Sequence, residues 1–327
     1  MNVFEFLGLP ADHRKPNKCV QLVKHFDEVT EKNKTGKTFG LQKKYDGVNC
    51  IVVVTCKGEI GVFSRTGKAF TNTVSFIADI DGDLPSGADV AAVYMGELIT
   101  LTEGVSLEQL SGMVNPNRTK PLECTKAVNN LRFMCFDVIN SVEFALGKTD
   151  NPYWFRLEQL VRALPLHNPA IRPVQLINQV SEYNGDDAFI KQECDFQVKE
   201  YNEEGIVVCD MDADWEAGHK GYRKMKVVRG VDYDLRCVGY EEGTGKYAGK
   251  VANLIFDWKN GDTIKCMLGK GWTHDDAEEM LFDILNENPY SVIGSIFQVY
   301  ALQESSKGKL RLAKVGEQRH DKDEADV

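Results

Sequence analysis

The apolar residues of this chain occur in short, β-branched runs that turn residues interrupt. The clearest run is Val48 to Thr55, which Lys57-Gly58-Glu59 separates from a second run at Ile60 to Ser64. Two such runs across a short glycine turn predict an antiparallel hairpin. No apolar run approaches the roughly 20 residues that a membrane-spanning helix needs. We therefore expect no membrane partner.

Other segments predict further strands and some helices in the first two thirds of the chain. Pro16 is expected to begin a helix through Val20, Val23 and Phe26. Asn151 is expected to cap a second helix, with Pro152 in its first turn. The remaining predicted segments are strands at Val90 to Leu101, Leu131 to Ile139, Ile206 to Cys209 and Arg223 to Val228, and helices at Ser106 to Val114 and Asn151 to Leu164.

After Arg229 the predicted strands become shorter and glycine becomes denser. Lys259-Asn260-Gly261-Asp262 is typical of a tight hairpin, and Thr273 with Asp276 is typical of a helix cap. About five strands and one helix favour a small Greek-key barrel of the oligonucleotide-binding (OB) type. We expect two domains, residues 1–229 and 230–327. The predicted strands are Asp234 to Tyr240, Val251 to Trp258, Thr263 to Leu268, Gly294 to Leu302 and Lys309 to Val315.

The composition supports a folded protein and leaves its partner open. The 327 residues are 43% hydrophobic and 9% aromatic, which is enough for a sizeable core. The net charge of −10 argues against nucleic acid, but binding follows the local field, and Lys220 to Arg229 holds five basic residues and no acid. Nine cysteines without any Cys-x-x-Cys, and a start without a secretory signal, favour free thiols in the cytoplasm and disfavour structural zinc.

The strongest local signal for chemistry is Lys44-Tyr45-Asp46-Gly47, at the entry to the Val48 strand. A lysine is nucleophilic only when it is neutral, and burial beside other cations lowers its pKa. Lys224 and Lys226 alternate on one predicted strand, so they face the same side and are candidates for those cations. By itself the tetrapeptide is equally typical of a surface β-turn.

Further motifs follow in a fixed order, and with them the chain resembles the covalent nucleotidyltransferases. Within that superfamily it is most similar to the short bacteriophage ATP-dependent DNA ligases. The resemblance implies an α+β, ATP-grasp-like nucleotidyltransferase domain of antiparallel sheets and helices, followed by an OB-fold barrel. It rests on Lys44 to Gly47, Ser64-Arg65-Thr66-Gly67, Gly96-Glu97-Leu98, Cys135-Phe136-Asp137, Glu204-Gly205-Ile206-Val207-Val208 and Lys224-Met225-Lys226.

The resemblance also implies a role for each matching residue. Lys44 would take AMP as a phosphoramidate, with Lys224 and Lys226 as the other catalytic residues. The implied cofactors are ATP and Mg²⁺, with Mn²⁺ as an alternative metal, and the implied partner is nicked duplex DNA. The implied sites are adenine at Gln42 and Phe136, ribose at Glu97, metal at Glu204 and Glu97, α-phosphate at Lys224 and Lys226, nucleotide and DNA at Arg65, pyrophosphate at Arg319 and Lys322, and DNA phosphates at Lys246 and Lys250.

Each of these residues also has an ordinary structural interpretation. Phe136 alone would be core, Glu97 a buried paired carboxylate, and Arg319 part of a charged chain end. Only the ordered series favours the functional interpretation.

Three positions depart from the family pattern. Asn49 and Cys209 stand where the family usually carries a cation, and Gly96 replaces a common Asp. Either Lys220 or Arg223 substitutes for the missing charge, or phosphate affinity is weaker.

These observations predict an enzyme that seals DNA nicks. We expect it to be a monomer and to be located in the cytoplasm. If a phage encodes the protein, this would be the cytoplasm of the host cell. Two enzyme rivals share the lysine motif, an RNA ligase and an mRNA-capping guanylyltransferase. A third alternative is a non-catalytic OB-fold protein that binds nucleic acid.

Overall fold

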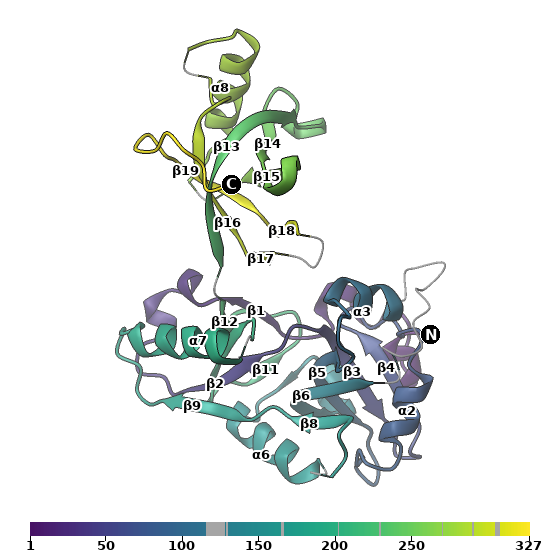
Figure 1. Ribbon diagram of the computed structural model, residues 1–327. Coiled ribbons are helices and arrows are strands. Elements are labelled where there is room, and N and C mark those ends of the chain that lie inside the picture. The colour runs from purple at the N-terminus through teal and green to yellow at the C-terminus, as the bar shows by residue number, and fades with distance from the viewer. Residues whose placement is uncertain are drawn as a thin grey trace. The chain divides into compact units, whose positions relative to one another are not determined.

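The computed structural model describes residues 1–115, 128, 130–164, 167–201, 203–228, 230–269, 271–289, 291–304 and 308–327. The chain divides into two compact units, Met1–Val228 and Arg229–Val327, which Figure 1 shows. The boundary predicted between Arg229 and Asp232 starts at Arg229, which lies outside the described residues.

The first unit is built on two five-stranded sheets. Most strand pairs are antiparallel, as predicted, but two edge strands pair in parallel: β1 (Leu22–His25) with β12 (Lys220–Val228), and β8 (Ile171–Pro173) with β6 (Leu131–Asn140). The first sheet has the order β1 (Leu22–His25), β12 (Lys220–Val228), β10 (Gly205–Asp210), β2 (Phe39–Lys44) and β9 (Leu176–Val180). The second has the order β4 (Ile60–Ser64), β3 (Val48–Val54), β5 (Ala92–Thr100), β6 (Leu131–Asn140) and β8 (Ile171–Pro173).

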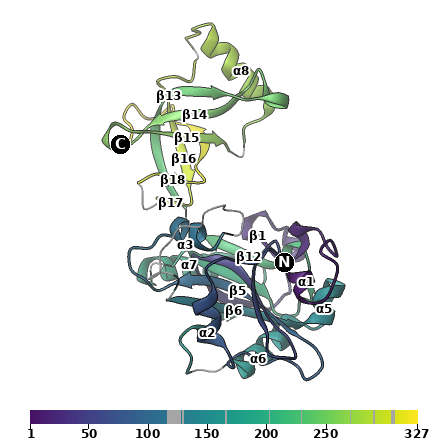
Figure 2. The same cartoon turned by 90° about the vertical axis from the view of Figure 1, so that its right-hand side faces the viewer.

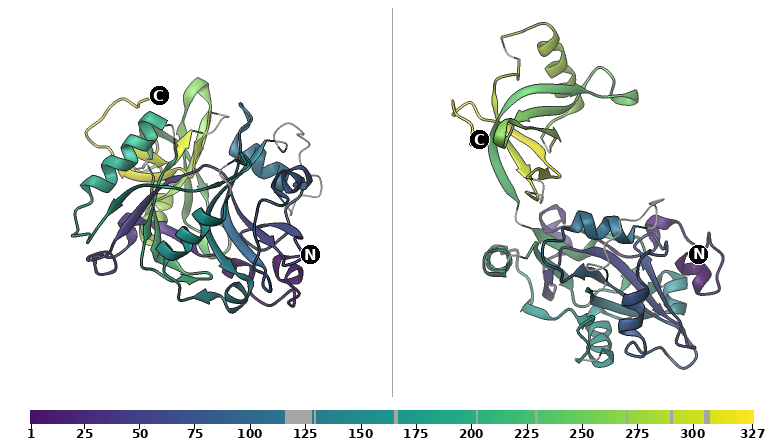
Figure 3. Two further views of the ribbon diagram at one scale, coloured as in Figure 1. Left: turned by 90° about the horizontal axis from the view of Figure 1, so that it is seen from below. Right: turned by 45° about the vertical axis from the view of Figure 1, so that its right-hand side comes forward.

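Helices surround both sheets of this unit. Helix α7 (Ala188–Tyr201) lies along the first sheet (Figure 3), and its Ile190 and Cys194 share a core cluster with Leu41 and Val208 of that sheet. The helices are α1 (Val3–Phe6), α2 (Val74–Ile80), α3 (Leu107–Val114), α5 (Ser141–Leu146), α6 (Tyr153–Ala163) and α7 (Ala188–Tyr201), and a two-stranded ladder joins β7 (Lys148–Thr149) to β11 (Trp215–Glu216).

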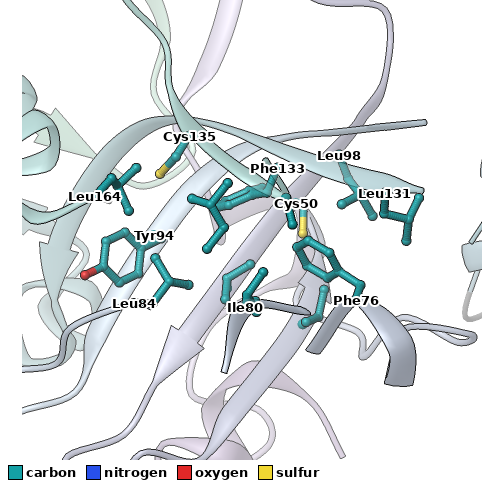
Figure 4. Close-up of a cluster of buried hydrophobic side chains, with 14 of the residues drawn as sticks. Cys50, Phe76, Ile80, Leu84, Tyr94, Leu98, Leu131, Phe133, Cys135 and Leu164 are labelled. Atoms are coloured by element: carbon teal, nitrogen blue, oxygen red, sulfur yellow. The ribbon is translucent and has the colours of Figure 1, made fainter. Parts of the chain in front are cut away.

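The largest core cluster of the first unit lies on one face of the second sheet. Figure 4 shows Tyr94, Leu98 and Phe133 of β5 and β6 beside Phe76 and Ile80 of α2. These side chains are at most 1% exposed. The cluster therefore provides a rigid base for the ends of β3 to β6, which carry the motif residues.

Local signals predict many of these elements. The hairpin of β3 and β4 and the helix predicted at Ser106 to Val114 are confirmed, and Ser106 caps that helix. The helix expected from Pro16 is wrong: a 3₁₀ turn covers Pro16–Lys18, and Leu22–His25 forms β1 because it pairs with β12. The cap expected at Asn151 is also wrong, because its amide donates to Glu143 and Pro152 occupies the cap position.

The second unit is a closed five-stranded barrel, as predicted. Asn260 and Gly261 adopt positive φ in the predicted hairpin, and Thr273 and Asp276 form the predicted cap of α8. Figure 2 displays the barrel strands and α8 (His274–Leu285). In barrel order the strands are β13 (Val231–Glu242), β14 (Val251–Asp257), β15 (Thr263–Leu268), β19 (Lys314–Gln318) and β16 (Ile296–Ala301), and β17 (Gln303–Glu304) pairs with β18 (Leu310–Arg311) outside it.

None of the helices in the described ranges is both long enough and apolar enough to span a bilayer.

Candidate active site

Lys44 ends strand β2 and faces the start of β10, where Gly205 is its register partner. Its ammonium binds the carboxylate of Glu204, the residue immediately before β10. Gly205 has φ of +150°, and a Cβ there would lie 2.2 Å from the carbonyl oxygen of Val227. Only glycine therefore fits the position directly after Glu204.

A cavity of about 260 Å³ lies beside Lys44 within the first unit. It collects side chains from both sheets, since β2 and β12 belong to the first sheet while β5 and β6 belong to the second. The predicted site residues that line it are Gln42, Lys44, Arg65, Glu97, Phe136, Lys224 and Lys226. Residues Val20 to Val23 also line it, and sequence reasoning missed them because they were assigned to a helix.

Glu97 lies opposite Asn49 in the β3–β5 pair, and the Asn49 side chain hydrogen-bonds to it. Burial raises the pKa of the Glu97 carboxyl to about 7, the Lys44 ammonium opposes this rise, and the Glu204 carboxylate adds to it. Glu97 and Glu204 are thus close enough to repel each other. A divalent cation between two such carboxylates would relieve this repulsion.

At the other end of the cavity, Gln42 lies beside Tyr153 of α6. The Tyr153 hydroxyl is 2.8 Å from the carbonyl oxygen of Phe136 and 3.1 Å from Gln42 Oε1, and its single hydrogen serves only one of these acceptors. Gln42 Nε2 is buried and has no partner. A half-turn of the amide lets Nε2 donate to the hydroxyl and leaves Oε1 as the unpartnered buried atom, which would accept from an amino group.

Lys224 and Lys226 both line the cavity, as their alternation on β12 requires. Lys224 is 6% exposed, and its ammonium lies 3.0 Å from Asp137 Oδ2 and 4.6 Å from the centre of the Phe136 ring. The pKa of Lys226 is lowered, first by burial and then by the charge of Lys44. Lys226 therefore lies close enough to Lys44 for their charges to repel, while Lys44 is also bound by the Glu204 carboxylate.

Arg65 is exposed at the end of β4 and borders two cavities. The second, of about 450 Å³, shares Asn49, Arg65 and Glu97 with the first and extends along Ser64 and Thr66 to α3. Arg65 therefore lies where a group bound in one cavity would meet a group bound in the other.

The structure explains one of the three departures from the family pattern. A Cβ on Gly96 would lie 2.5 Å from the carbonyl oxygen of Met134, so no aspartate fits there. Cys209 is fully buried, with Sγ 3.5 Å from Gln42 Oε1. Of the suggested substitutes for the missing cation, Arg223 binds Asp214 and Glu216.

Lys220, the other suggested substitute, is exposed at the beginning of β12 and does not line either cavity among the described residues.

The predicted site residues of the barrel all contact other residues of the second unit. Arg319 and Lys322 both bind the buried carboxylate of Asp234, Arg319 at 3.0 Å. Lys250 binds Glu278 of α8 at 2.5 Å, while Lys246 is exposed with its ammonium 4.8 Å from the ring centre of Tyr247.

A catalytic unit of two sheets followed by an OB-like barrel defines the class of protein as a nucleotidyltransferase with an OB-like domain. The family model described as "ATP dependent DNA ligase domain" matches residues 20–227, and the model "DNA ligase OB-like domain" matches residues 242–319. The chain belongs to the family of ATP-dependent DNA ligases.

Individual relatives are distant. A "Probable DNA ligase" of Streptomyces coelicolor is 26% identical over 240 residues, which cover 70% of this chain but only 43% of that protein. The Pmar-Lig_Pre structure is similar at a TM-score of 0.75 and 19% identity, covering 93% of this chain and 68% of that one. The ATP-dependent DNA ligase of bacteriophage T7 in complex with ATP has a TM-score of 0.52 and 17% identity, covering 92% and 99%. These structures share the fold.

Proposed function

We propose that this protein is an ATP-dependent DNA ligase that seals nicks in duplex DNA and that Lys44 is its nucleophile. The observation that carries the proposal is the single cavity that Lys44 shares with Gln42, Glu97, Phe136, Lys224 and Lys226. Membership of the ligase family and the T7 ligase structure with its bound ATP support the choice of nucleotide.

The chemistry consists of three displacements at phosphorus, in which positioning and charge neutralisation dominate. Lys44 Nζ loses its proton and attacks the α-phosphorus of ATP, so that a P–N bond forms and pyrophosphate leaves. The Glu204 carboxylate, which already binds the ammonium, is the nearest acceptor for that proton. The 5′-phosphate at the nick then displaces Lys44 and takes the AMP. Finally the 3′-hydroxyl attacks that phosphate and expels AMP.

The roles of the other residues follow from their places around the cavity. Phe136 stacks on adenine, the Gln42 oxygen accepts from its amino group, and Glu97 binds the ribose hydroxyls. Lys224 and Lys226 neutralise the α-phosphate. In the barrel, Arg319 and Lys322 orient pyrophosphate, while Lys246 and Lys250 contact DNA phosphates together with Arg65 of the first unit.

Magnesium fits the residues present. Glu97 and Glu204 supply two mutually repelling carboxylates, and Mg²⁺ is commonly held by one or two carboxylates with substrate phosphates and water completing its shell. No group of three or more His, Cys, Asp or Glu able to hold a metal occurs in the described part of the chain. When bound, Mg²⁺ would offset the negative charge of the phosphates. We propose Mg²⁺ or Mn²⁺, a monomer and a cytoplasmic location.

With its amide turned as described above, Gln42 would distinguish adenine from guanine. An amide oxygen accepts from the adenine amino group but repels the carbonyl oxygen that guanine carries at the same position, which disfavours the capping-enzyme alternative.

The test supplies labelled ATP or GTP to the protein and then compares nicked DNA with nicked RNA. A covalent AMP adduct formed only from ATP, followed by joining of the DNA, supports the proposal. An adduct from GTP, joining of RNA alone, or salt-sensitive binding without any adduct would each favour one of the three alternatives.

A further inference from the structure

Three buried charged side chains form a cluster beside Phe136, which lines the cavity at Lys44. Asp137 is 1% exposed, Arg156 is 3% exposed and Lys224 is 6% exposed. Arg156 donates to both carboxylate oxygens of Asp137, from Nε at 2.8 Å and from Nη2 at 3.1 Å. Lys224 donates to the same carboxylate at 3.0 Å. Two cations therefore share one anion, and the cluster has an excess of one positive charge.

Neighbouring groups do not remove this excess. Burial raises the pKa of Tyr153 and of Cys209, so both are neutral at physiological pH. Asp214 also attracts Arg156, but it is 42% exposed and binds Arg223 directly. Glu216 is 52% exposed and also binds Arg223, so it does not neutralise Arg156.

A buried charge without a partner is costly, so a site that carries one is suited to an oppositely charged ligand. The excess charge is accessible at Lys224, which lines the cavity and whose ammonium lies 4.2 Å from the Tyr153 ring centre and 4.6 Å from that of Phe136. Arg156 is held in place by a second set of hydrogen bonds, in which its Nη1 donates to the carbonyl oxygens of Asn151 and Ala213.

We propose that Arg156 is a positioning residue for the phosphate of the bound nucleotide. It acts through Asp137, which it holds in place, and Asp137 in turn holds Lys224 against the cavity wall. Arg156 also supplies the excess positive charge that the AMP phosphate balances. The cluster thus replaces charge that the neutral Asn49 and Cys209 do not provide. This inference rests on the proposed function only in assuming that an adenine nucleotide occupies the cavity.

The test compares the affinity for AMP with that for adenosine, which lacks the phosphate, by calorimetry on protein cleared of bound AMP with pyrophosphate. Arg156→Gln is expected to weaken AMP binding about tenfold, the effect of losing one charge-assisted interaction, and to leave adenosine binding unchanged. Arg156→Lys keeps the charge and is expected to restore most of the AMP affinity. Arg162→Gln is the matched control, because Arg162 is on the same helix, is 70% exposed and binds Glu158.

Asp137→Asn provides an effect in the opposite direction. It removes the carboxylate that both cations share and so increases the excess positive charge, so AMP affinity relative to adenosine is expected to rise. The rate of Lys44 adenylation is expected to fall, because Lys224 loses its anchor.

The inference would be overturned if Arg156→Gln left the ratio of AMP affinity to adenosine affinity unchanged, whether both affinities fell equally or neither changed. If Arg156→Gln does not fold, a loss of AMP preference in Arg156→Lys would overturn it and a retained preference would support it. Failure of the proposed function is seen separately, as a wild-type protein that forms no AMP adduct from ATP.

Discussion

The Lys44 ammonium is bound by the carboxylate of Glu204, which lies 160 residues further along the chain. The β2–β10 pair brings the two together. This ion pair holds the Lys44 side chain at the cavity in which we propose that it meets ATP.

Replacing Lys44 tests its role as the nucleophile. Lys44→Ala is expected to abolish AMP attachment, because no other amine takes its place, and to leave nicked-DNA binding largely intact, because DNA binding is spread over many phosphate contacts. The adduct is measured with labelled ATP after denaturation and DNA binding by gel shift. Lys43→Ala is the matched control, since Lys43 is adjacent in sequence and binds Glu203 at 3.4 Å instead. An adduct in the Lys44 variant would show that another residue is the nucleophile.

Phe136→Ala is expected to raise the KM for ATP, because it removes a stacking surface worth about 1 to 3 kcal/mol. Phe196→Ala on α7, where the ring is 49% exposed, controls for loss of an aromatic side chain elsewhere. Both are measured by steady-state adenylation and by thermal melting. An unchanged KM with a lower melting temperature would assign Phe136 to the core alone.

Cys209→Lys shows how burial changes a prediction made from charge alone. Sequence reasoning suggests that a lysine there would improve ATP binding. The structure places Cys209 at 0% exposure, opposite the cation Lys224 in the β10–β12 pair. We therefore expect a loss of about 2 kcal/mol or more in the free energy of unfolding and no decrease in the KM for ATP. Urea denaturation against Cys209→Ala measures the effect, and a stable variant with a lower KM would refute it.

We expect the free energy of unfolding to depend on pH through the titration of Glu97. Its carboxyl has a pKa of about 7 in the folded protein, above its ordinary value. The folded state thus holds the proton more tightly than the unfolded state, and stability falls as pH rises from about 4.5 to 7. In metal-free buffer Glu97→Gln is expected to stabilise the protein by about 2 kcal/mol at pH 8 and to have little effect near pH 4.5. Chemical denaturation at both pH values measures this, and an equal effect at both would contradict it.

Arg319 and Lys322 are expected to act only in the step that releases pyrophosphate. Removing residues 317–327 would test this poorly, because it cuts into β19. The better variant is Arg319→Gln with Lys322→Gln and Asp234→Asn, since Asp234 would otherwise remain buried without its two cations. It is expected to lose self-adenylation from ATP yet still join a nick whose 5′ end already carries AMP. Asp234→Asn alone is the control, and equal loss on both substrates would indicate a damaged barrel.

The sequence by itself determined the features that depend on neighbours in the chain. The β3–β4 hairpin, the helix at Leu107–Val114, the Thr273 cap and the Asn260-Gly261 turn were all predictable, because each depends on the conformational preferences of a few adjacent residues. The motif order likewise indicated the family, since the spacing of motifs is a property of the chain alone.

Only the tertiary structure decided what depends on distant partners. The spacing of Val20, Val23 and Phe26 suits a helix, yet Leu22–His25 is a strand because β12 offers an edge for parallel pairing. Asp137 lies 19 residues from Arg156 and 87 from Lys224, so no local pattern reveals their shared buried charge. The same holds for Cys209, where burial rather than residue type decides whether a cation is tolerated, because desolvation depends on everything packed around the site.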